Sequence, residues 1–443
     1  MNVFKERRAK LASELASVGG ASAVVLWAHP EQLRNDDVHH LYKPDSNLFY
    51  LTGWEEPESV LVFRPGMEPE STLFVRDKDP ARETWEGFRY GPAAAKSEFG
   101  MGETHLMSEF ESKFVGLLKG CDRLYYRFGT DQLRDLRMLA LMDRVRETHG
   151  RSGRGLLPIH DSKELLGKLR VIKSAADVGF LREACEISTR GHVKAMAFTR
   201  PGMNERQVMA TVLHSFYMDG AAREGYPAIV ASGDSATTLH YRFNDQPCRD
   251  GDLLLLDAGA ETANGYTGDV TRTFPVNGKF SAPQRSVYEA VLRVQKSLIA
   301  MAKPGAAFRS LMDHAIEALT DEMRELGLLK GARQELIDSL AFRRYYPHGM
   351  GHFLGMDVHD SGLYNVDGQS EKHSRLLEPG MCFTVEPGLY VPASDESAPP
   401  ELRGIGVRIE DNVVVTEAGC EVLTGGAPKE ISEIEALMRP SKA

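Results

Sequence analysis

Four acidic residues in the second half of the sequence stand where apolar strands are expected to end or break. Asp257 closes the run LLLLD, Asp269 lies in YTGDVTRTF, Glu386 in CFTVEPG and Glu410 in GVRIEDNVVV. A single carboxylate of this kind is usually a turn residue that accepts hydrogen bonds from the backbone. Because desolvation disfavours an ionised carboxylate beside buried leucines, four such groups together indicate a bound cation.

A histidine-rich segment adds neutral ligands to these carboxylates. Residues 345–360 read YYPHGMGHFLGMDVHD, which places His348, His352 and His359 among glycines. His348 and His352 have the i,i+4 spacing of a helical zinc site, but the intervening Gly-Met-Gly has no glutamate and disfavours a helix. We therefore interpret the segment as a loop that carries ligands.

The combined donor set is rich in oxygen and contains no thiolate. Such a set favours Mn²⁺ or a similar ion, with Co²⁺ and Zn²⁺ as substitutes. Two divalent cations would balance the charge of four carboxylates, which without metal would repel one another and raise at least one pKa. Two ions about 3.5 Å apart would share a hydroxide as nucleophile and polarise a carbonyl.

The elements that must position these residues fall into two groups. Residues 1–170 are predicted to form a small α/β unit and residues 171–443 a second unit of alternating helices and strands. In the first unit we expect helices over 4–17 and 131–148, with strands at 22–28, 47–54, 59–65 and 71–77. In the second we expect helices over 174–198, 204–219, 283–302 and 306–327, with strands at 252–257, 270–275, 382–386 and 406–416.

Composition limits the class of protein. The chain has 443 residues and a net charge of −10, so no basic surplus is available for nucleic acid. The longest apolar runs, AVVLWA and LLLL, are far shorter than a membrane span. The N-terminus MNVFKERRAKLASEL lacks the apolar core of a signal peptide. The five cysteines are scattered and odd in number, so we expect reduced thiols and a cytoplasmic location.

The motifs together resemble a known family. LLLLDAG, GYTGDVTRTFPVNGKF, HGMGHFLGMDVHD, TVEPGLY and GVRIEDNVVVT are similar to the metal-binding series of the pita-bread metallopeptidases, over about residues 174–435. PDSNLFYLTGWEEPESVLVF (44–63) and TWEGFRYG (84–91) resemble the N-terminal domain of bacterial aminopeptidase P. The resemblance implies an α/β (α+β) chain, with a creatinase-like α/β domain over 1–170 and a pita-bread catalytic domain over 171–443.

The same resemblance implies the roles of the metal ligands. Asp257 would hold one ion, His352 and Glu386 the other, and Asp269 and Glu410 would bridge the two. Creatinases and histone-chaperone relatives share the architecture but do not keep these five ligands. All five are present here, which favours an active enzyme.

Four residues acquire roles around the metals by the same resemblance. His240, in TTLHYRFND, would help to hold the substrate, and His348 would line the proline pocket. His359 would contact the carbonyl of the cleaved bond or its developing oxyanion. Glu386 would take a proton and pass it to the proline nitrogen, which is otherwise a poor leaving group.

Three further residues are candidates for contact with the substrate. Arg408, two residues before Glu410, could steady a carboxylate ligand or face the substrate. Tyr390 and Trp85 would supply apolar walls for the proline ring. In the family the tryptophan reaches the site of a neighbouring subunit; the alternative for Trp85 is an ordinary core position.

The function implied is that of an Xaa-Pro aminopeptidase. Its substrates would be peptides with proline in the second position, and the family implies a homodimer or homotetramer. An Xaa-Pro dipeptidase (prolidase) with the same core is the nearest alternative. A non-catalytic peptide-binding protein on the same fold is the alternative of another class, and a serine or thiol hydrolase is a more distant one.

Overall fold

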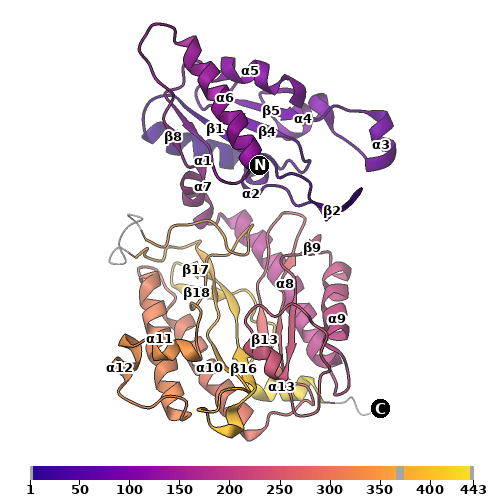
Figure 1. The fold of residues 1–443 in the computed structure, drawn as a ribbon, viewed down its shortest axis with the longest axis vertical. Coiled ribbons are helices and arrows are strands. Elements are labelled where there is room, and N and C mark those ends of the chain that lie inside the picture. The colour runs from indigo at the N-terminus through magenta and orange to yellow at the C-terminus, as the bar shows by residue number, and fades with distance from the viewer. Residues whose placement is uncertain (1–2, 366–373, 440–443) are drawn as a thin grey trace. The chain divides into compact units, whose positions relative to one another are not determined.

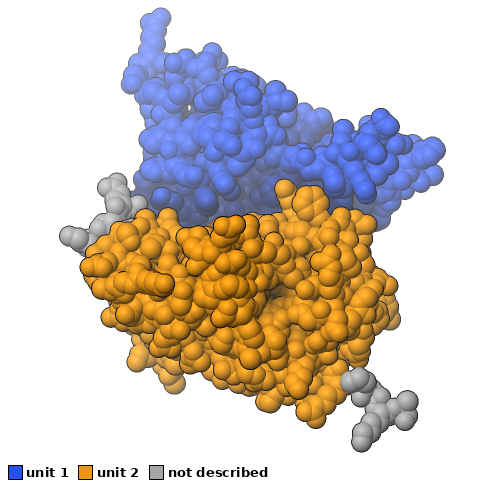
Figure 2. Space-filling view, turned by 60° about the horizontal axis from the view of Figure 1, so that its bottom comes forward, with its two compact units in different colours: residues 1–169 blue, residues 170–443 orange. Residues whose placement is uncertain are grey.

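The computed structural model describes residues 3–365 and 374–439. The chain divides into two compact units, Met1–Leu169 and Arg170–Ala443, which Figure 2 colours blue and orange. Each unit has its own hydrophobic core. None of the helices in these described ranges has the length and apolarity that crossing a bilayer would require.

Unit 1 is built on a mixed sheet with the strand order β6-β5-β4-β1-β7-β8. The central strand β1 is almost wholly buried, because its sequence SAVVLW is apolar on both faces. The strands of this unit are β1 Ser22–Trp27, β2 Leu33–Asn35, β3 Val38–His39, β4 Val60–Phe63, β5 Ser71–Val75, β6 Glu103–Leu106, β7 Arg123–Tyr125 and β8 Ile159–His160. Its helices are α1 Val3–Ser17, α2 Ser46–Thr52, α3 Pro80–Glu86, α4 Gly91–Phe99, α5 Phe110–Leu117, α6 Gln132–Thr148 and α7 Ser162–Val171, the last of which ends in unit 2.

The strand predicted at 47–54 is wrong: the structure has helix α2 there. Asp45 begins the helix, because its side chain accepts hydrogen bonds from the backbone N–H groups of Asn47 and Leu48. Gly53 ends it in a left-handed conformation with φ of 75°. These caps at both ends outweigh the strand propensity of the aromatic and β-branched residues between them.

Unit 2 contains small antiparallel sheets that lie between two pairs of helices, α8 with α9 and α10 with α11 (Figure 1). The long helices all form close to their predicted positions. The helices of this unit are α8 Ala175–Phe198, α9 Glu205–Met218, α10 Ala282–Met301, α11 Phe308–Glu325, α12 Arg333–Asp338 and α13 Ile431–Leu437. Its strands are β9 Arg223–Glu224, β10 Ile229–Ser232, β11 Leu253–Asp257, β12 Ala260–Glu261, β13 Thr271–Pro275, β14 Cys382–Val385, β15 Gly388–Val391, β16 Ile405–Arg408, β17 Asp411–Thr416 and β18 Gly419–Val422.

Helix α8 begins with a capping box formed by Ser174 and Asp177. The Ser174 side chain accepts a hydrogen bond from the N–H group of Asp177, whose carboxylate accepts one from the N–H group of Ser174. The strand predicted over 406–416 is instead two strands, β16 and β17, which pair with different partners. The chain changes partner at Ile409–Glu410, so the break falls at one of the candidate ligands.

Candidate metal centre

Strand register brings the four acidic residues together. Asp257, the last residue of β11, lies opposite Ile229 on one side and Thr271 on the other, two residues after Asp269. In the other sheet Val385 pairs with Asp411. Glu386 directly follows the first residue of this pair and Glu410 directly precedes the second. The Glu410 N–H group donates to the Thr271 carbonyl at 3.0 Å, which joins the two halves of the site.

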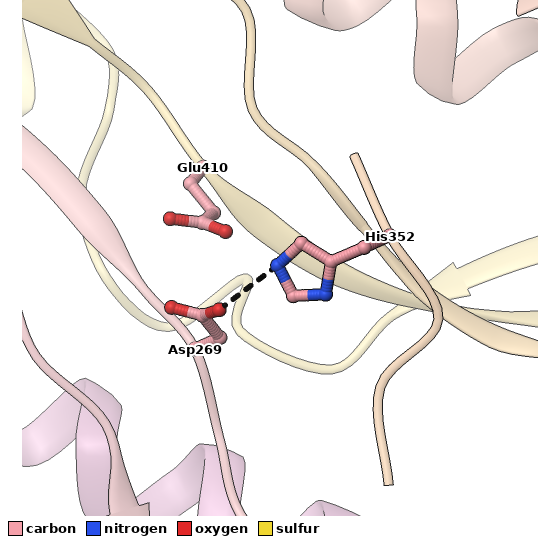
Figure 3. A group of neighbouring side chains, drawn as sticks. All are labelled: Asp269, His352 and Glu410. Atoms are coloured by element: carbon pink, nitrogen blue, oxygen red, sulfur yellow. Dashed lines mark ion pairs between the residues drawn. The ribbon is translucent and has the colours of Figure 1, made fainter. Parts of the chain in front are cut away.

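Asp269, His352 and Glu410 form a convergent group. One ligand atom from each of the three lies within 4.8 Å of the others. Figure 3 shows the side chains pointing toward one another from three separate segments, with the ion pair of His352 and Asp269 dashed. His352 Nε2 is 3.3 Å from Asp269 Oδ2 and 3.6 Å from Glu386 Oε1. Two carboxylates and an imidazole at this separation suit a divalent cation.

The histidine-rich segment is a loop, as predicted, and it is fastened to β14. The His352 N–H group donates to the Thr384 hydroxyl at 3.0 Å, and the Thr384 N–H group donates back to the His352 carbonyl at 2.9 Å. Gly351 lies so close to the Thr384 carbonyl that a Cβ atom there would approach the oxygen to 1.8 Å. Glycine at this position therefore allows the backbone contact that orients the imidazole.

Asp257 is paired with a protein cation. Arg408 Nη2 is 2.5 Å from Asp257 Oδ2, and both residues are buried, at 4% and 8% exposed. Arg408 Nε also donates to the Thr271 hydroxyl at 3.0 Å, and that hydroxyl donates to Glu410 at 2.7 Å. Of the two roles considered for Arg408, this geometry supports the steadying of a carboxylate ligand. The guanidinium also lines the cavity described below.

Replacing Arg408 by methionine is expected to destabilise the metal-free chain by about 3–5 kcal/mol, because Asp257 would be left buried without its partner. Denaturant unfolding of the metal-stripped variant and wild type measures this difference. Arg249→Met, at an exposed position, is the matched control and should change stability by less than about 0.5 kcal/mol. Equal losses in the two variants would contradict a stabilising pair at Asp257.

Tyr226 is a residue of the site that sequence reasoning missed. Its hydroxyl lies 2.5 Å from Asp257 Oδ1 and 2.5 Å from Asp269 Oδ1. A phenol has one hydrogen to donate, so it can satisfy only one of two ionised carboxylates at a time. A proton or a metal ion on this pair resolves the conflict. Tyr226 belongs to no strand or helix, and only its place just before β10 could have drawn attention to it.

Asn412 is a second missed residue, and it fixes the backbone of Asp269. Its side-chain oxygen accepts from the Asp269 N–H group at 2.9 Å, and its amide nitrogen donates to the Asp269 carbonyl at 2.5 Å. Asn412 is 1% exposed and lies on β17, two residues after Glu410. The buried side-chain amide of Asn412 therefore fixes the backbone of Asp269, and it does so from β17, the strand that follows Glu410.

The acidic groups are strained electrostatically without metal. Burial, together with the charge of Asp269, raises the pKa of Glu410 well above its ordinary range. Burial is also the main cause that raises the pKa of Asp257, and that of Glu386 to about 7. Burial lowers the pKa of His352, but its contacts with Asp269 and Glu386 outweigh this and raise it to about 9. Buried carboxylates that resist ionisation fit a site designed around cations.

The contribution of Glu386 to the stability of the metal-free chain is expected to fall as pH rises. The Glu386 pKa is raised from 4.5 to about 7 in the folded chain, so its stabilising contribution is full below 4.5 and is lost up to about 7. His352, raised from 6.5 to about 9, acts in the same direction at higher pH. Denaturant unfolding of stripped wild type and Glu386→Gln at pH 5 and pH 7 isolates this contribution. Relative to the variant, the wild type should be less stable at pH 7 than at pH 5; an equal change in both proteins would contradict the assignment.

A cavity of about 360 Å³ opens onto these groups. It is lined on one side by Asp257, Asp269, Glu386 and Glu410, so an amine would be attracted to that side. Its apolar wall, also missed from the sequence, is formed by Pro227, Ile229, Leu239 and Val358. The volume is that of a small-molecule or short-peptide site.

The predicted histidines all line the cavity. His240 lies there in an exposed turn, shortly after the 3₁₀ turn at Gly233–Thr237 that follows β10. His348 Nδ1 is 2.7 Å from its neighbouring Gly349 carbonyl and its Nε2 is 2.8 Å from the Tyr390 hydroxyl. Burial and the Arg408 charge lower the His348 pKa to about 3, so this imidazole is neutral. The His359 ring lies 4.2 Å from that of His352.

Tyr390 is not among the described residues that line this cavity, and Trp85 belongs to the other unit. Tyr390 is 3% exposed. Its hydroxyl is hydrogen-bonded to His348 and to Arg408, two residues that do line the cavity. Trp85 belongs to unit 1, on α3, where it is 89% exposed. The core alternative for Trp85 is therefore wrong, and its contact with substrate stays a prediction.

Comparison with known proteins gives matches over almost the whole chain. Residues 179–417 match the profile of metallopeptidase family M24, and residues 4–125 match that of the aminopeptidase P N-terminal domain. The chain is 40% identical to the Xaa-Pro aminopeptidase of Haemophilus influenzae, with 98% of this chain and 96% of the relative covered.

Solved structures agree with these matches. Aminopeptidase PepP of Pseudomonas aeruginosa superposes with a TM-score of 0.92 at 41% identity, covering 98% of this chain and 97% of the other. Zinc-substituted Escherichia coli aminopeptidase P in complex with product superposes with a TM-score of 0.91 at 38% identity, with coverage of 98% and 97%. At these identities both the fold and the order of the motifs are shared.

Proposed function

The chain belongs to metallopeptidase family M24 and carries the N-terminal domain of aminopeptidase P, and from this membership we infer that it is an Xaa-Pro aminopeptidase. It hydrolyses the bond between an N-terminal residue and a following proline. One observation in the structure carries this conclusion: Asp269, His352 and Glu410 converge within 4.8 Å at the wall of a cavity of peptide size. We assign residues 1–170 to the aminopeptidase P-like domain and 171–443 to the catalytic domain.

The proposed ligand set is the five residues of the metal motifs. Asp257 would hold one ion, His352 and Glu386 the other, and Asp269 and Glu410 would be shared by both. Their burial supports this set, because it raises the pKa values of Asp257, Glu386 and Glu410, and a bound cation would stabilise the ionised carboxylates. Divalent ions bound there would activate water and polarise the substrate carbonyl. An oxygen-rich set with one imidazole favours Mn²⁺, with Co²⁺ and Zn²⁺ as substitutes.

The positions of the side chains around the cavity support the remaining proposed roles. The N-terminal amine of the peptide is drawn to the carboxylates of the cavity, and His240, which also lines the cavity, helps to hold the substrate. His359 donates to the carbonyl oxygen as negative charge develops on it. Glu386 takes a proton from the attacking water and delivers it to the proline nitrogen, so that the C–N bond breaks to a carboxylic acid and a peptide beginning with proline. His348, held neutral, would line the proline pocket, with Tyr390 and Arg408 setting its orientation.

Two properties of the whole protein are part of the same proposal. Trp85 and Phe88, three residues apart in unit 1, are 89% and 63% exposed, and large apolar side chains left exposed in this way support a homodimer or homotetramer. Each of the five cysteines is a free thiol, and four are buried, which supports a cytoplasmic enzyme.

The test combines metal analysis with peptide hydrolysis. Chelator-stripped protein should be inactive on an Xaa-Pro-Yaa tripeptide, and Mn²⁺ should restore release of the N-terminal residue. An Xaa-Ala-Yaa peptide is the matched control and should remain intact. Cleavage restricted to Xaa-Pro dipeptides would replace the aminopeptidase by a dipeptidase, and full activity after complete metal removal would refute the metal-dependent function.

A further inference from the structure

The loop that carries His359 is fastened by a buried ion-pair cluster outside the metal centre. The cluster, here called the basic anchor, consists of Arg170, Lys173 and Asp360. Lys173 Nζ is 2.9 Å from Asp360 Oδ2, Arg170 Nη2 contacts Asp360 Oδ1, and all three side chains are at most 2% exposed. Asp360 directly follows His359, so the anchor acts one residue away from the imidazole.

The His359 ring itself has little else to hold it. It has no hydrogen bond to any described residue, and among these residues its one ring contact is with His352, at 4.2 Å between ring centres. Its direction therefore depends on the backbone of its loop. That backbone is closed by the Asp360 N–H group, which donates to the Phe353 carbonyl at 2.8 Å, and by the Gly355 N–H group, which donates to Asp357 at 3.1 Å.

The loop is also too tightly packed to shift without loss of the anchor. A Cβ atom at Gly355 would meet Asp360 Oδ2 at 2.2 Å. The Gly355 carbonyl accepts from the Thr267 N–H group at 3.0 Å, two residues before Asp269. On the other side, the Lys173 N–H group donates to the Gly380 carbonyl at 2.9 Å, in the turn that leads into β14. The loop is thus bonded to the segment that leads to Asp269, and the anchor is bonded to the turn before β14, the strand that precedes Glu386.

We propose that Arg170 and Lys173 are positioning residues for His359, which they hold toward the substrate carbonyl through the buried carboxylate of Asp360. The inference rests on the proposed role of His359 in hydrolysis. A buried ion pair contributes little net stability. We therefore assign the anchor the role of fixing the position of the loop that carries His359. A displacement of about 1 Å at a catalytic group can cost on the order of a hundredfold in rate.

A double-mutant cycle separates positioning from simple stabilisation. Lys173→Met should lower kcat about tenfold, with KM and metal content unchanged. In a His359→Ala background the same substitution should change kcat by less than about twofold, because the group it positions is absent. An equal tenfold loss in both backgrounds would overturn the proposal. Lys168→Met, at an exposed position on α7, is the control and should be without effect.

Two further measurements keep the test decisive. Arg170→Lys retains the charge and should fold even if Lys173→Met does not, so it is carried through the same cycle. The Cε1–H resonance of His359 in the metal-free protein, identified by its loss in His359→Ala, should shift in Lys173→Met and Arg170→Lys but not in Lys168→Met. An unshifted resonance would also overturn the proposal. If His359→Ala alone kept full turnover, the role of His359 in the proposed function would fail, and the inference with it.

Discussion

Replacing Asp269 or Glu410 by alanine is expected to abolish metal binding and peptide hydrolysis together. Both residues belong to the convergent group of ligand atoms within 4.8 Å, and both are assigned as ligands shared by two ions. Loss of one shared ligand therefore weakens both positions. Removing several kcal/mol of transition-state stabilisation corresponds to a fall in kcat/KM of roughly a thousandfold or more.

Metal content per subunit, measured after dialysis, is read beside turnover of an Xaa-Pro-Yaa peptide. Glu417→Ala is the matched control, because Glu417 is exposed in the turn between β17 and β18. It should keep both metal and activity. A variant of Asp269 or Glu410 that retained two ions per subunit and normal turnover would show that the shared-ligand assignment is mistaken.

His359→Ala is expected to give the opposite pattern, with metal retained and turnover lost. His359 lines the cavity beside His352 but lies outside the convergent group of ligand atoms. Removing one preorganised donor to a developing oxyanion typically costs about a hundred- to a thousandfold in kcat. Because the interaction strengthens only in the transition state, KM should change little.

Steady-state kinetics with metal analysis distinguishes this from a binding role. His214→Ala, an exposed histidine on α9, serves as the control for loss of an imidazole. A rise in KM with kcat unchanged would assign His359 to substrate binding alone. Loss of metal in His359→Ala would instead place it among the ligands.

The acidic candidates could be found from the sequence because the signal is local. Asp257 and Glu386 each follow an apolar run, and Asp269 and Glu410 each interrupt one. A charge beside buried leucines is costly, and that cost can be recognised without knowing the fold. The long helices were predictable for a similar reason, since their caps and periodicity lie within one segment. In both cases the signal lies within one continuous segment of the chain.

Contacts between distant segments could not be found in this way. Tyr226 meets Asp269 across 43 residues, Asn412 meets it across 143, and Lys173 meets Asp360 across 187. Such pairs depend on strand register and on which loops face each other, and neither leaves a periodic pattern. Helix α2 was missed because the Asp45 and Gly53 caps compete with strand propensity, and a single sequence does not show which prevails.

The Arg408–Asp257 pair makes the two proposed metal positions unequal. An ion that approaches Asp257 competes with a tethered guanidinium 2.5 Å away, whereas one that approaches Asp269 and His352 meets a carboxylate and an imidazole. Occupancy should then rise in two stages as the concentration of the divalent metal increases. When the metal is scarce, the half-filled form would predominate, and activity would follow the second, weaker stage.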